Sequence, residues 1–400
     1  MFLKTFKFRI YPSKAQSAQI DKNIGCCRWV YNWGLQKKLE SYNILGKGIS
    51  CFDLMKQLTE KKKEKEYCWL NEACAQSLQA ALRHLDNAFT SFFKKQSKFP
   101  KFKTKKKSKL SCHFPQSIFL GEDWVKLPKI GKIPCIFDRN AMGEIKTCVI
   151  SKTKTNKYFI SILIQTPEEP SKKEKIVEST TLGLDLGIKF LVTLSDGRKI
   201  ENPKYFEKQE KKLKIFQKRC NKKQKGSKNR EKAKLKLALC YEKIVNQKQD
   251  FLHKLTYQLT HENQVNSIGI ENLNIKGMVK NHKLSKSINS CKWGELIRQL
   301  EYKCNWYGKN LIKIGRFEPS SKMCCLCGRL KINLTLEDRE WMCEQCQATH
   351  DRDVNAAKNI KHMAYLTSLR TQGTESETKQ SFPEQLVLED QSYEGKNLEV

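Results

Sequence analysis

Residues 181–189 read Thr-Leu-Gly-Leu-Asp-Leu-Gly-Ile-Lys, and a single carboxylate, Asp185, stands in the middle of this apolar run. A short run of branched apolar residues predicts a buried β-strand. An ionised carboxylate inside such a strand is costly unless it binds a metal ion or a partner group. Asp185 is therefore the first candidate for a functional residue, and its strand is an expected core element.

Two more acids stand at the ends of predicted core elements. Glu271 closes an expected strand, and Asp353 opens an expected helix. Taken singly, Glu271 fits a surface residue at a strand end and Asp353 fits a helix N-cap. Together with Asp185 they offer three hard oxygen ligands from two strands and one helix, which can hold two Mg²⁺ (or Mn²⁺) ions across a scissile phosphate. Asp351, two residues before Asp353, is the less favoured ligand.

A cluster of cysteines forms two CxxC pairs with fifteen residues between them: Cys324, Cys327, Cys343 and Cys346. Two such pairs place four thiolates at the tips of two turns, in the tetrahedral arrangement that zinc prefers. A complete set of four predicts a closed, structural Zn²⁺ site. We interpret Cys325 as a bystander, and His350 as an alternative ligand that the complete set makes unnecessary. The remaining cysteines are interpreted as small buried hydrophobic residues in a reducing compartment.

The charge of the chain predicts a polyanionic partner. With 76 basic and 42 acidic residues, the net charge is +34, and no compact fold gains from such self-repulsion. A membrane surface is disfavoured, because no apolar run approaches the roughly 18–20 residues of a membrane span, and residues 1–11 lack the pattern of a secretory signal. We expect a cytoplasmic, nucleoid-associated protein of a bacterium or archaeon.

Residues 94–109 hold nine lysines and no acid, with Phe99 and Phe102 between them. A charge run is often only a solvated face, but the aromatic residues and the overall charge favour a phosphate-binding loop. The candidate nucleic-acid contacts in this loop are Lys101, Lys103, Lys105, Lys106 and Lys107.

The rest of the chain alternates between β-rich and helical segments. We expect a strand at 2–11, helices in pieces over 14–95 with the clearest at 71–93, short strands over 111–166 that close a small barrel with the first strand, a linker at 167–175, two apolar strands within 181–197, basic helices from 204 to about 261, a strand at 265–270, a helix near 293–307, a strand at 310–314, a helix at 353–360 and a disordered acidic tail from 371.

Five segments, in this order along the chain, resemble the TnpB family encoded by insertion sequences. The resemblance covers residues 1 to about 365, with a doubled cysteine at 324–325 and the acidic tail as departures. The segments are the family start at 6–12, the first and second RuvC-like motifs at 181–189 and 270–278, the start of the zinc ribbon at 319–328, and the third RuvC-like motif at 351–360.

The resemblance implies an α/β multidomain protein. Its RNase H-like (RuvC-like) nuclease domain carries an inserted zinc ribbon and follows an N-terminal β-barrel wedge and a helical recognition lobe. The expected boundaries are 1–12 and 110–168 for the β-barrel wedge domain, 13–109 for the recognition lobe, 176–318 and 349–368 for the nuclease domain, 319–348 for the ribbon, and 369–400 for the tail.

The resemblance also implies activity and partners. We expect an RNA-guided DNA endonuclease that binds a guide RNA from the transposon end and double-stranded target DNA, with Asp185, Glu271 and Asp353 as the catalytic metal-binding acids. A short DNA motif beside the target would be read near Gln76 and Gln79, since glutamine suits adenine in the major groove. The oligomeric state is left open, with a monomer favoured.

Other interpretations remain. A miniature type V CRISPR effector shares the nuclease and differs in genomic neighbourhood. A nuclease-dead RNA-guided repressor is disfavoured by the intact acids. A tyrosine-type single-strand transposase is disfavoured because none of the seven histidines forms an H-x-H pair. A plain zinc-ribbon binder leaves Asp185 unexplained.

Overall fold

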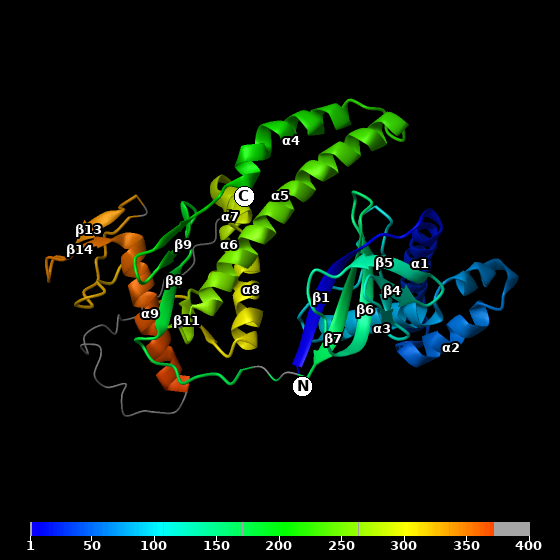
Figure 1. Ribbon diagram of the computed structural model, residues 1–400, viewed down its shortest axis with the longest axis horizontal. Coiled ribbons are helices and arrows are strands. Elements are labelled where there is room, and N and C mark those ends of the chain that lie inside the picture. The colour runs from blue at the N-terminus through cyan, green and yellow to red at the C-terminus, as the bar shows by residue number, and fades with distance from the viewer. Residues whose placement is uncertain are drawn as a thin grey trace. The chain divides into compact units, whose positions relative to one another are not determined.

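The structure, a computed structural model, describes residues 2–371 except for positions 107, 168, 170, 263 and 336 (Figure 1). It divides into two compact units. The first unit holds residues up to 169 together with 223–239, and the second holds the rest of the described chain. The break at 169–170 falls inside the segment 167–175 that the sequence predicts to be a linker.

The helices of the first unit form where the sequence predicts helical pieces. Ser13 caps the first helix in a capping box: its side chain accepts from Gln16 N, and the Gln16 side chain accepts from Ser13 N. Gly46 ends that helix at a φ of 63°, a left-handed conformation that favours glycine. The expected helix at 71–93 begins later, at Ala75. The helices are α1 (Lys14–Leu45), α2 (Cys51–Lys61), the 3₁₀ helix η1 (Lys65–Glu72) and α3 (Ala75–Phe93).

The strands of the first unit form a curled antiparallel sheet with the order β2-β6-β7-β1-β5-β4-β3, and residues 228–239 of this unit form the beginning of the helix α5 (Lys228–His261). Side chains alternate across its strands, so Phe8 and Ile10 of β1 are buried against the helices. This curled sheet lies where the sequence predicts a small barrel, and β2 and β3 are at the two ends of its strand order. The strands are β1 (Phe2–Ile10), β2 (Leu110–Phe114), β3 (Phe119–Leu120), β4 (Trp124–Leu127), β5 (Gly131–Ile136), β6 (Glu144–Lys152) and β7 (Tyr158–Thr166).

The second unit is built on a five-stranded sheet with the order β10-β9-β8-β11-β12. The first three strands form an antiparallel meander, and β11 is parallel to both β8 and β12. The sequence predicts all of these strands except β10, which is three residues long. The strands are β8 (Thr181–Asp185), β9 (Phe190–Leu194), β10 (Lys199–Glu201), β11 (Ser267–Ile270) and β12 (Asn310–Lys313).

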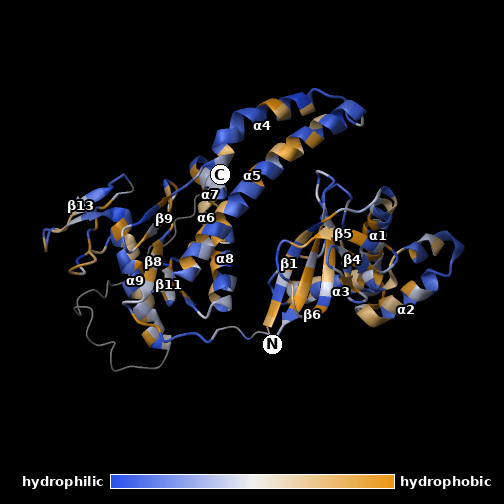
Figure 2. Ribbon diagram, viewed as in Figure 1, coloured by the Kyte–Doolittle hydropathy of each residue, from blue (hydrophilic) through white to orange (hydrophobic). Residues whose placement is uncertain are grey.

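Helices cover both faces of this sheet. Leu184 and Ile270 pack in one core with Leu255, Leu296 and other side chains of α5, α7 and α8, and α9 contacts β8 and β11. Figure 2 shows these strands as largely hydrophobic and α4 as largely hydrophilic, which agrees with the basic helices expected from residue 204. The helices are α4 (Tyr205–Asn221), α5 (Lys228–His261), α6 (Ile275–Met278), α7 (His282–Cys291), α8 (Trp293–Trp306) and α9 (Arg352–Thr371).

The cysteine cluster lies in a small irregular segment between β12 and α9. It contains one two-stranded sheet, β13 (Glu340–Met342) with β14 (Thr349–Asp351). The following helix α9 is longer than the expected 353–360 and continues to Thr371, so the first three positions of the expected tail are helical. The rest of that tail lies outside the described residues.

Candidate active site

Strands β8 and β11 carry the same pattern of apolar residue, glycine, apolar residue and acid. The two strands are parallel, with Gly183 paired to Gly269 and Leu184 to Ile270. Because side chains alternate along a strand, Asp185 shares a face with Gly183. Glu271 follows Ile270 by one residue and continues the same alternation. The register therefore brings the two acids to the same edge of the sheet, on the face away from Leu184 and Ile270.

Helix α9 lies directly against that face. A Cβ atom at Gly183 would lie 1.9 Å from the backbone oxygen of Ala357, and one at Gly269 would lie 2.6 Å from the Cβ of Ala364. The two glycines therefore let the helix backbone approach the sheet. Asp353 lies about one turn before Ala357, so the first turn of α9 reaches the edge that carries the other acids.

Asp351 and Asp353 have different surroundings. Asp351 Oδ1 accepts a hydrogen bond of 3.0 Å from Val354 N, and its Oδ2 lies 2.5 Å from Lys199 Nζ. Burial opposes the ionised form, but the Lys199 ammonium lowers the pKa of Asp351. Asp353 contacts the Arg352 guanidinium at 3.1 Å. The capping role that the sequence allowed for Asp353 is thus filled by Asp351.

The pKa of Asp185 indicates that a cation would stabilise its ionised form. Burial, followed by the negative charges of Glu271 and Asp353, raises the pKa of Asp185 to about 8, against a lowering by Arg352. A carboxyl with this pKa is largely protonated at neutral pH unless positive charge is brought to it. Carboxylate oxygens that repel one another in this way are suited to bind a hard divalent cation.

Ser320 connects Glu271 to α9. Its hydroxyl donates to Glu271 Oε1 at 2.6 Å, and its carbonyl accepts from Asn359 Nδ2 at 2.7 Å. Asn355 Nδ2 donates to the carbonyl of Met323 at 2.7 Å. Two buried asparagines of α9 therefore hold the segment that leads from Ser320 into the cysteine cluster.

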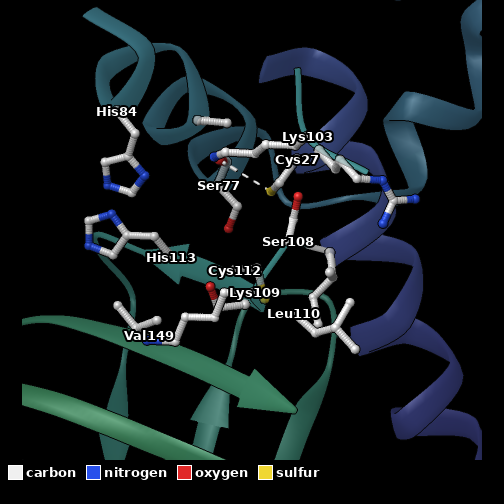
Figure 3. Close-up of a pocket in the computed structure, with 14 residues that line it drawn as sticks. Cys27, Ser77, His84, Lys103, Ser108, Lys109, Leu110, Cys112, His113 and Val149 are labelled. Atoms are coloured by element: carbon white, nitrogen blue, oxygen red, sulfur yellow. Dashed lines mark hydrogen bonds between the residues drawn. The ribbon is translucent and has the colours of Figure 1, made fainter. Parts of the chain in front are cut away.

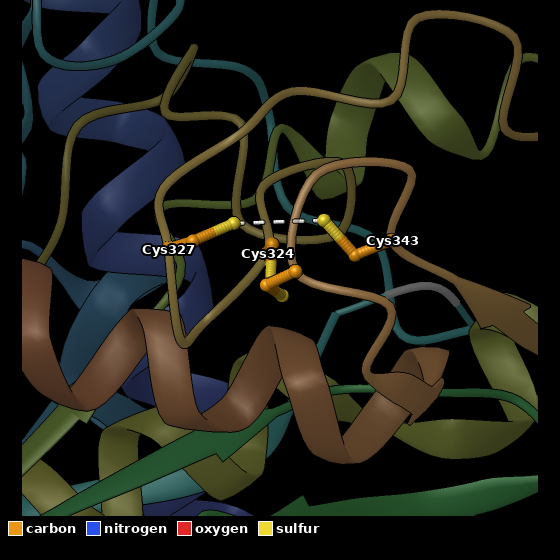
Figure 4. A group of neighbouring side chains, drawn as sticks. Cys324, Cys327 and Cys343 are labelled. Carbon is orange, nitrogen blue, oxygen red and sulfur yellow. Dashed lines mark hydrogen bonds between the residues drawn. The ribbon is translucent and has the colours of Figure 1, made fainter.

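The four cysteines converge on one point, as the sequence predicts. Their sulfur atoms all lie within 4.8 Å of one another, with Cys324 to Cys346 at 3.6 Å and Cys327 to Cys343 at 3.5 Å. Figure 4 shows Cys324, Cys327 and Cys343 of this group. Zn–S bonds of about 2.3 Å in a tetrahedron give S···S distances of roughly 3.8 Å, so the geometry fits zinc. Within the described part of the chain, these cysteines are the one group of three or more metal-binding side chains that converges this closely, and Asp185, Glu271 and Asp353 do not form such a group.

Cys325 and His350 flank this group without joining it. The Cys325 backbone N–H donates to Asn355 Oδ1 at 2.9 Å. His350 is buried, and its Nε2 lies 3.1 Å from the sulfur of Cys324. His350 is therefore placed to donate to a cysteine ligand rather than to replace one.

The candidate nucleic-acid contacts lie in the first unit. Gln76 and Gln79 lie one turn apart on α3; Gln79 is exposed, and Gln76 Nε2 donates to Gln116 Oε1 at 2.9 Å. Lys103 is half-buried, with its ammonium 3.6 Å from the centre of the Tyr31 ring. The exposed lysines of the same loop are Lys101, Lys105 and Lys106, and Lys107 lies outside the described residues.

Comparison with known proteins decides the family. Residues 160–282 match the family described as "Probable transposase", residues 293–360 the Cas12f1-like TNB domain, and residues 1–47 a helix-turn-helix domain of the same transposase group. A protein of Streptomyces pristinaespiralis named "Putative RNA-guided DNA endonuclease" is 39% identical over 89% of this chain and 88% of its own. InsQ of Escherichia coli K12, with the same description, is 31% identical over 90% of this chain and 91% of its own. This chain belongs to the TnpB family.

A solved structure supports the α/β fold of this TnpB-family chain. The Cas12f1 protein in a complex with sgRNA and target DNA superimposes with a TM-score of 0.58 over 90% of this chain and 98% of its own, at 15% identity. No helix among the described residues is long and apolar enough to span a membrane.

The sequence patterns identified the acidic residues of the site but not the uncharged residues that position them. Gly183 and Gly269 seat α9, and the repeated glycine two residues before each acid is the signal that could have identified them. Ser320 and Asn359 stand in the zinc-ribbon and third RuvC-like motifs, but no spacing rule connects them to Glu271.

Proposed function

We propose that this chain is the RNA-guided DNA endonuclease of a transposon, which cuts target DNA beside a short motif. The proposal is supported by the register of β8 and β11, which brings Asp185 and Glu271 to one edge of the second unit's sheet, and by the effect of the charges of Glu271 and Asp353 on the pKa of Asp185. The names of the curated relatives support the same activity. A nuclease-dead guide-binding protein would have no need for three mutually repelling acids.

The three acids are proposed to hold two Mg²⁺ or Mn²⁺ ions. Bound divalent ions would supply an activated water and stabilise the leaving oxygen. The protein's own contribution is to fix the carboxylates. The register of β8 and β11 sets Asp185 and Glu271, the Ser320 hydroxyl orients Glu271, and the Asp351 cap sets the start of α9 and with it Asp353.

The proposed layout is an RNase H-like nuclease domain with an inserted zinc ribbon, a β-barrel wedge and a helical recognition lobe. The order β10-β9-β8-β11-β12, with β11 and β12 parallel to β8, supports the RNase H-like interpretation. The match of residues 293–360 to a TNB domain and the convergence of four thiolates support a ribbon that binds zinc.

The proposed partners are a guide RNA transcribed from the transposon end and double-stranded target DNA, bound by a monomer. The charge of +34 suits two polyanions. In such complexes base pairing reads the target, while the protein grips backbone and a short flanking motif. The lysines of residues 94–109 are proposed to grip backbone, and Gln76 with the exposed Gln79 to read the motif.

The experiment that tests the function begins with the RNA that copurifies with the protein. Its sequence identifies the guide segment, and a plasmid with the matching target next to a randomised flank then reports cleavage and motif preference together. We expect Mg²⁺-dependent loss of plasmids that carry one flank. Absence of any bound RNA, or equal cleavage of unmatched plasmids, contradicts the proposal. A Gln76→Ala, Gln79→Ala double variant that keeps the flank preference contradicts the motif-reading role.

A further inference from the structure

A cavity of about 160 Å³ lies within the first unit, between α1, α3, β2 and the loop that precedes β2 (Figure 3). A single buried water needs only about 15 Å³ measured in this way, so the cavity has room for a larger polar group. It is far from the carboxylates of the second unit in sequence, and nothing in the proposed cleavage chemistry uses it.

The lining of this cavity is basic. Arg28 of α1, Lys103 and Lys109 of the loop, and two histidines, His84 of α3 and His113 of β2, border it. The imidazole rings of His84 and His113 are stacked, with centroids 5.1 Å apart. None of the described lining residues is an aspartate or glutamate. Positive groups gathered without a carboxylate favour an anion as the ligand.

Two buried polar atoms of the lining have no hydrogen-bond partner among the described residues. One is the hydroxyl oxygen of Ser77, a residue only 1% exposed, and the other is Nδ1 of His113. Leaving such buried groups without a hydrogen-bond partner destabilises the folded protein. A ligand with several acceptor oxygens would satisfy the Ser77 hydroxyl, and it would satisfy His113 Nδ1 when the imidazole is protonated.

The hydrogen bonds of His113 determine what its free nitrogen can do. The Thr147 hydroxyl donates to the carbonyl of Phe114 at 3.0 Å, so its oxygen accepts from His113 Nε2. Nε2 therefore carries a proton in either charge state, and Nδ1 becomes a second donor when the ring is protonated. Burial, and then the charge of His84, lowers the pKa of His113, and burial lowers the pKa of Lys103. An anion here would stabilise the protonated form of both.

We propose that this cavity is a phosphate-binding pocket that takes one phosphate group of a bound polynucleotide. The inference rests on the proposed function, which supplies the polynucleotide. A phosphate offers several acceptor oxygens to the Ser77 hydroxyl, the His113 Nδ1–H and the cations of Arg28, Lys103 and Lys109. Lys103 belongs both to the pocket lining and to the lysine loop. Its backbone is fixed to α1, because its N–H donates to Asn32 Oδ1 at 2.7 Å and its carbonyl accepts from Asn32 Nδ2 at 2.9 Å.

The test follows the imidazole resonances of His84 and His113 in the full chain by NMR. Inorganic phosphate is the first probe, and the copurifying RNA and a target duplex are the second and third. We expect phosphate to shift both resonances and to raise the pKa of His113, so phosphate affinity falls as pH rises through that pKa. Lys103→Met and Ser77→Ala should each weaken phosphate binding about tenfold. Lys154→Met, which removes an exposed cation of the same unit, should not weaken it.

Comparing the responses to RNA and to the duplex shows which polynucleotide supplies the phosphate. A shift of both imidazoles on addition of RNA alone, or only on addition of the duplex, supports the pocket and identifies the strand that fills it. Imidazoles that respond to neither polynucleotide, in a protein that binds RNA and cleaves its target, overturn the pocket and leave the proposed function standing. Imidazoles that respond to inorganic phosphate in a protein that binds no polynucleotide also overturn the inference, through failure of the proposed function itself.

Discussion

The hydroxyl of Ser320 donates a hydrogen bond of 2.6 Å to Oε1 of Glu271. Ser320 is 4% exposed, and its own carbonyl is held by Asn359 of α9. The orientation of one candidate catalytic acid therefore depends on the segment that leads into the cysteine cluster. A hydrogen bond to a charged group contributes about 1.5–3 kcal/mol, enough to matter for a metal ligand.

Ser320→Ala should slow single-turnover cleavage roughly tenfold, because it removes a hydrogen bond worth more than about 1.4 kcal/mol. Binding of guide and target should be unchanged, since phosphate contacts lie elsewhere. Ser320→Thr, which keeps a hydroxyl, should restore most of the rate. Ser321→Ala is the matched control at the neighbouring position. Equal cleavage rates for Ser320→Ala and Ser321→Ala would remove Ser320 from the site.

Gly183→Ala should destabilise the second unit, because the new Cβ would lie 1.9 Å from the Ala357 carbonyl oxygen. Displacing a helix backbone costs about 1–3 kcal/mol or more. Gly25→Ala is the matched control: this helical glycine has no atom within 4 Å of the position that an added methyl carbon would take, so alanine should stabilise α1 by about 0.5–1 kcal/mol. Calorimetric midpoints that move in the same direction for both variants would contradict the close seating of α9.

Lys303 predicts a pH dependence of stability. It is buried, its ammonium donates to His253 O and Thr256 Oγ1, and burial lowers its pKa to about 8. Between pH 8 and about 10.5 the unfolded chain holds more protons at this position, so the stability contributed by Lys303 rises with pH. Lys303→Met should flatten that rise in urea unfolding curves by about 2–3 kcal/mol. If the parent protein and Lys303→Met gain the same free energy of unfolding between about pH 8 and pH 10, burial does not lower the pKa of Lys303.

Cys343→Ser should release about one zinc per chain and unfold the segment around the cluster, since metal binding there also supplies folding free energy. Cys325→Ser is the matched control, because Cys325 lies outside the converging set and should leave the zinc in place. Elemental analysis of both variants measures the difference. A parent protein purified without zinc would refute the site.

The sequence predicted those parts of the fold and site that depend on local pattern. The apolar run around Asp185, the two CxxC pairs and the basic helices after residue 204 each carry their own signal within a few residues. Strand β10 was missed because three residues, Lys199–Glu201, are too few to carry a period. The length of α9 was underestimated because tertiary packing on β8 and β11, rather than residues 353–360 alone, stabilises the helix.

Relations between distant residues could not be predicted. Ser320 and Glu271 are 49 positions apart, and no rule of spacing relates a serine at the start of the ribbon to a strand-end acid. His84 and His113 meet only because α3 packs beside β2. The sequence allowed Asp353 to be the N-cap of α9. In the structure Val354 N donates to Asp351 Oδ1 instead, so Asp351 is the N-cap.

The last prediction distinguishes an enzyme from a binding protein. Asp185→Ala, Glu271→Ala and Asp353→Ala should each abolish target cleavage, because each removes a ligand from a shared cluster. Combining them should add nothing further, since residues that act as one unit fail together. Binding of guide RNA and target should survive in all three, measured by gel shift with the copurifying RNA. Mg²⁺ or Mn²⁺ should support cleavage by the parent protein, and Ca²⁺, larger and looser in geometry, should bind without supporting it well.

Asp351→Ala provides the internal control for this set. Asp351 carries the same charge two residues away, but its oxygens are engaged by Val354 N and Lys199. Its loss should destabilise the start of α9 by about 1 kcal/mol, the usual cost of a lost cap, while much of the cleavage activity remains. If Asp351→Ala is as inactive as Asp353→Ala at a temperature where both are folded, the cluster includes Asp351 as a ligand. If Asp185→Ala cleaves at the parental rate with its guide bound, the carboxylates are not the catalytic groups, and the chain is a guide-bound DNA-binding protein whose cleavage comes from another nuclease.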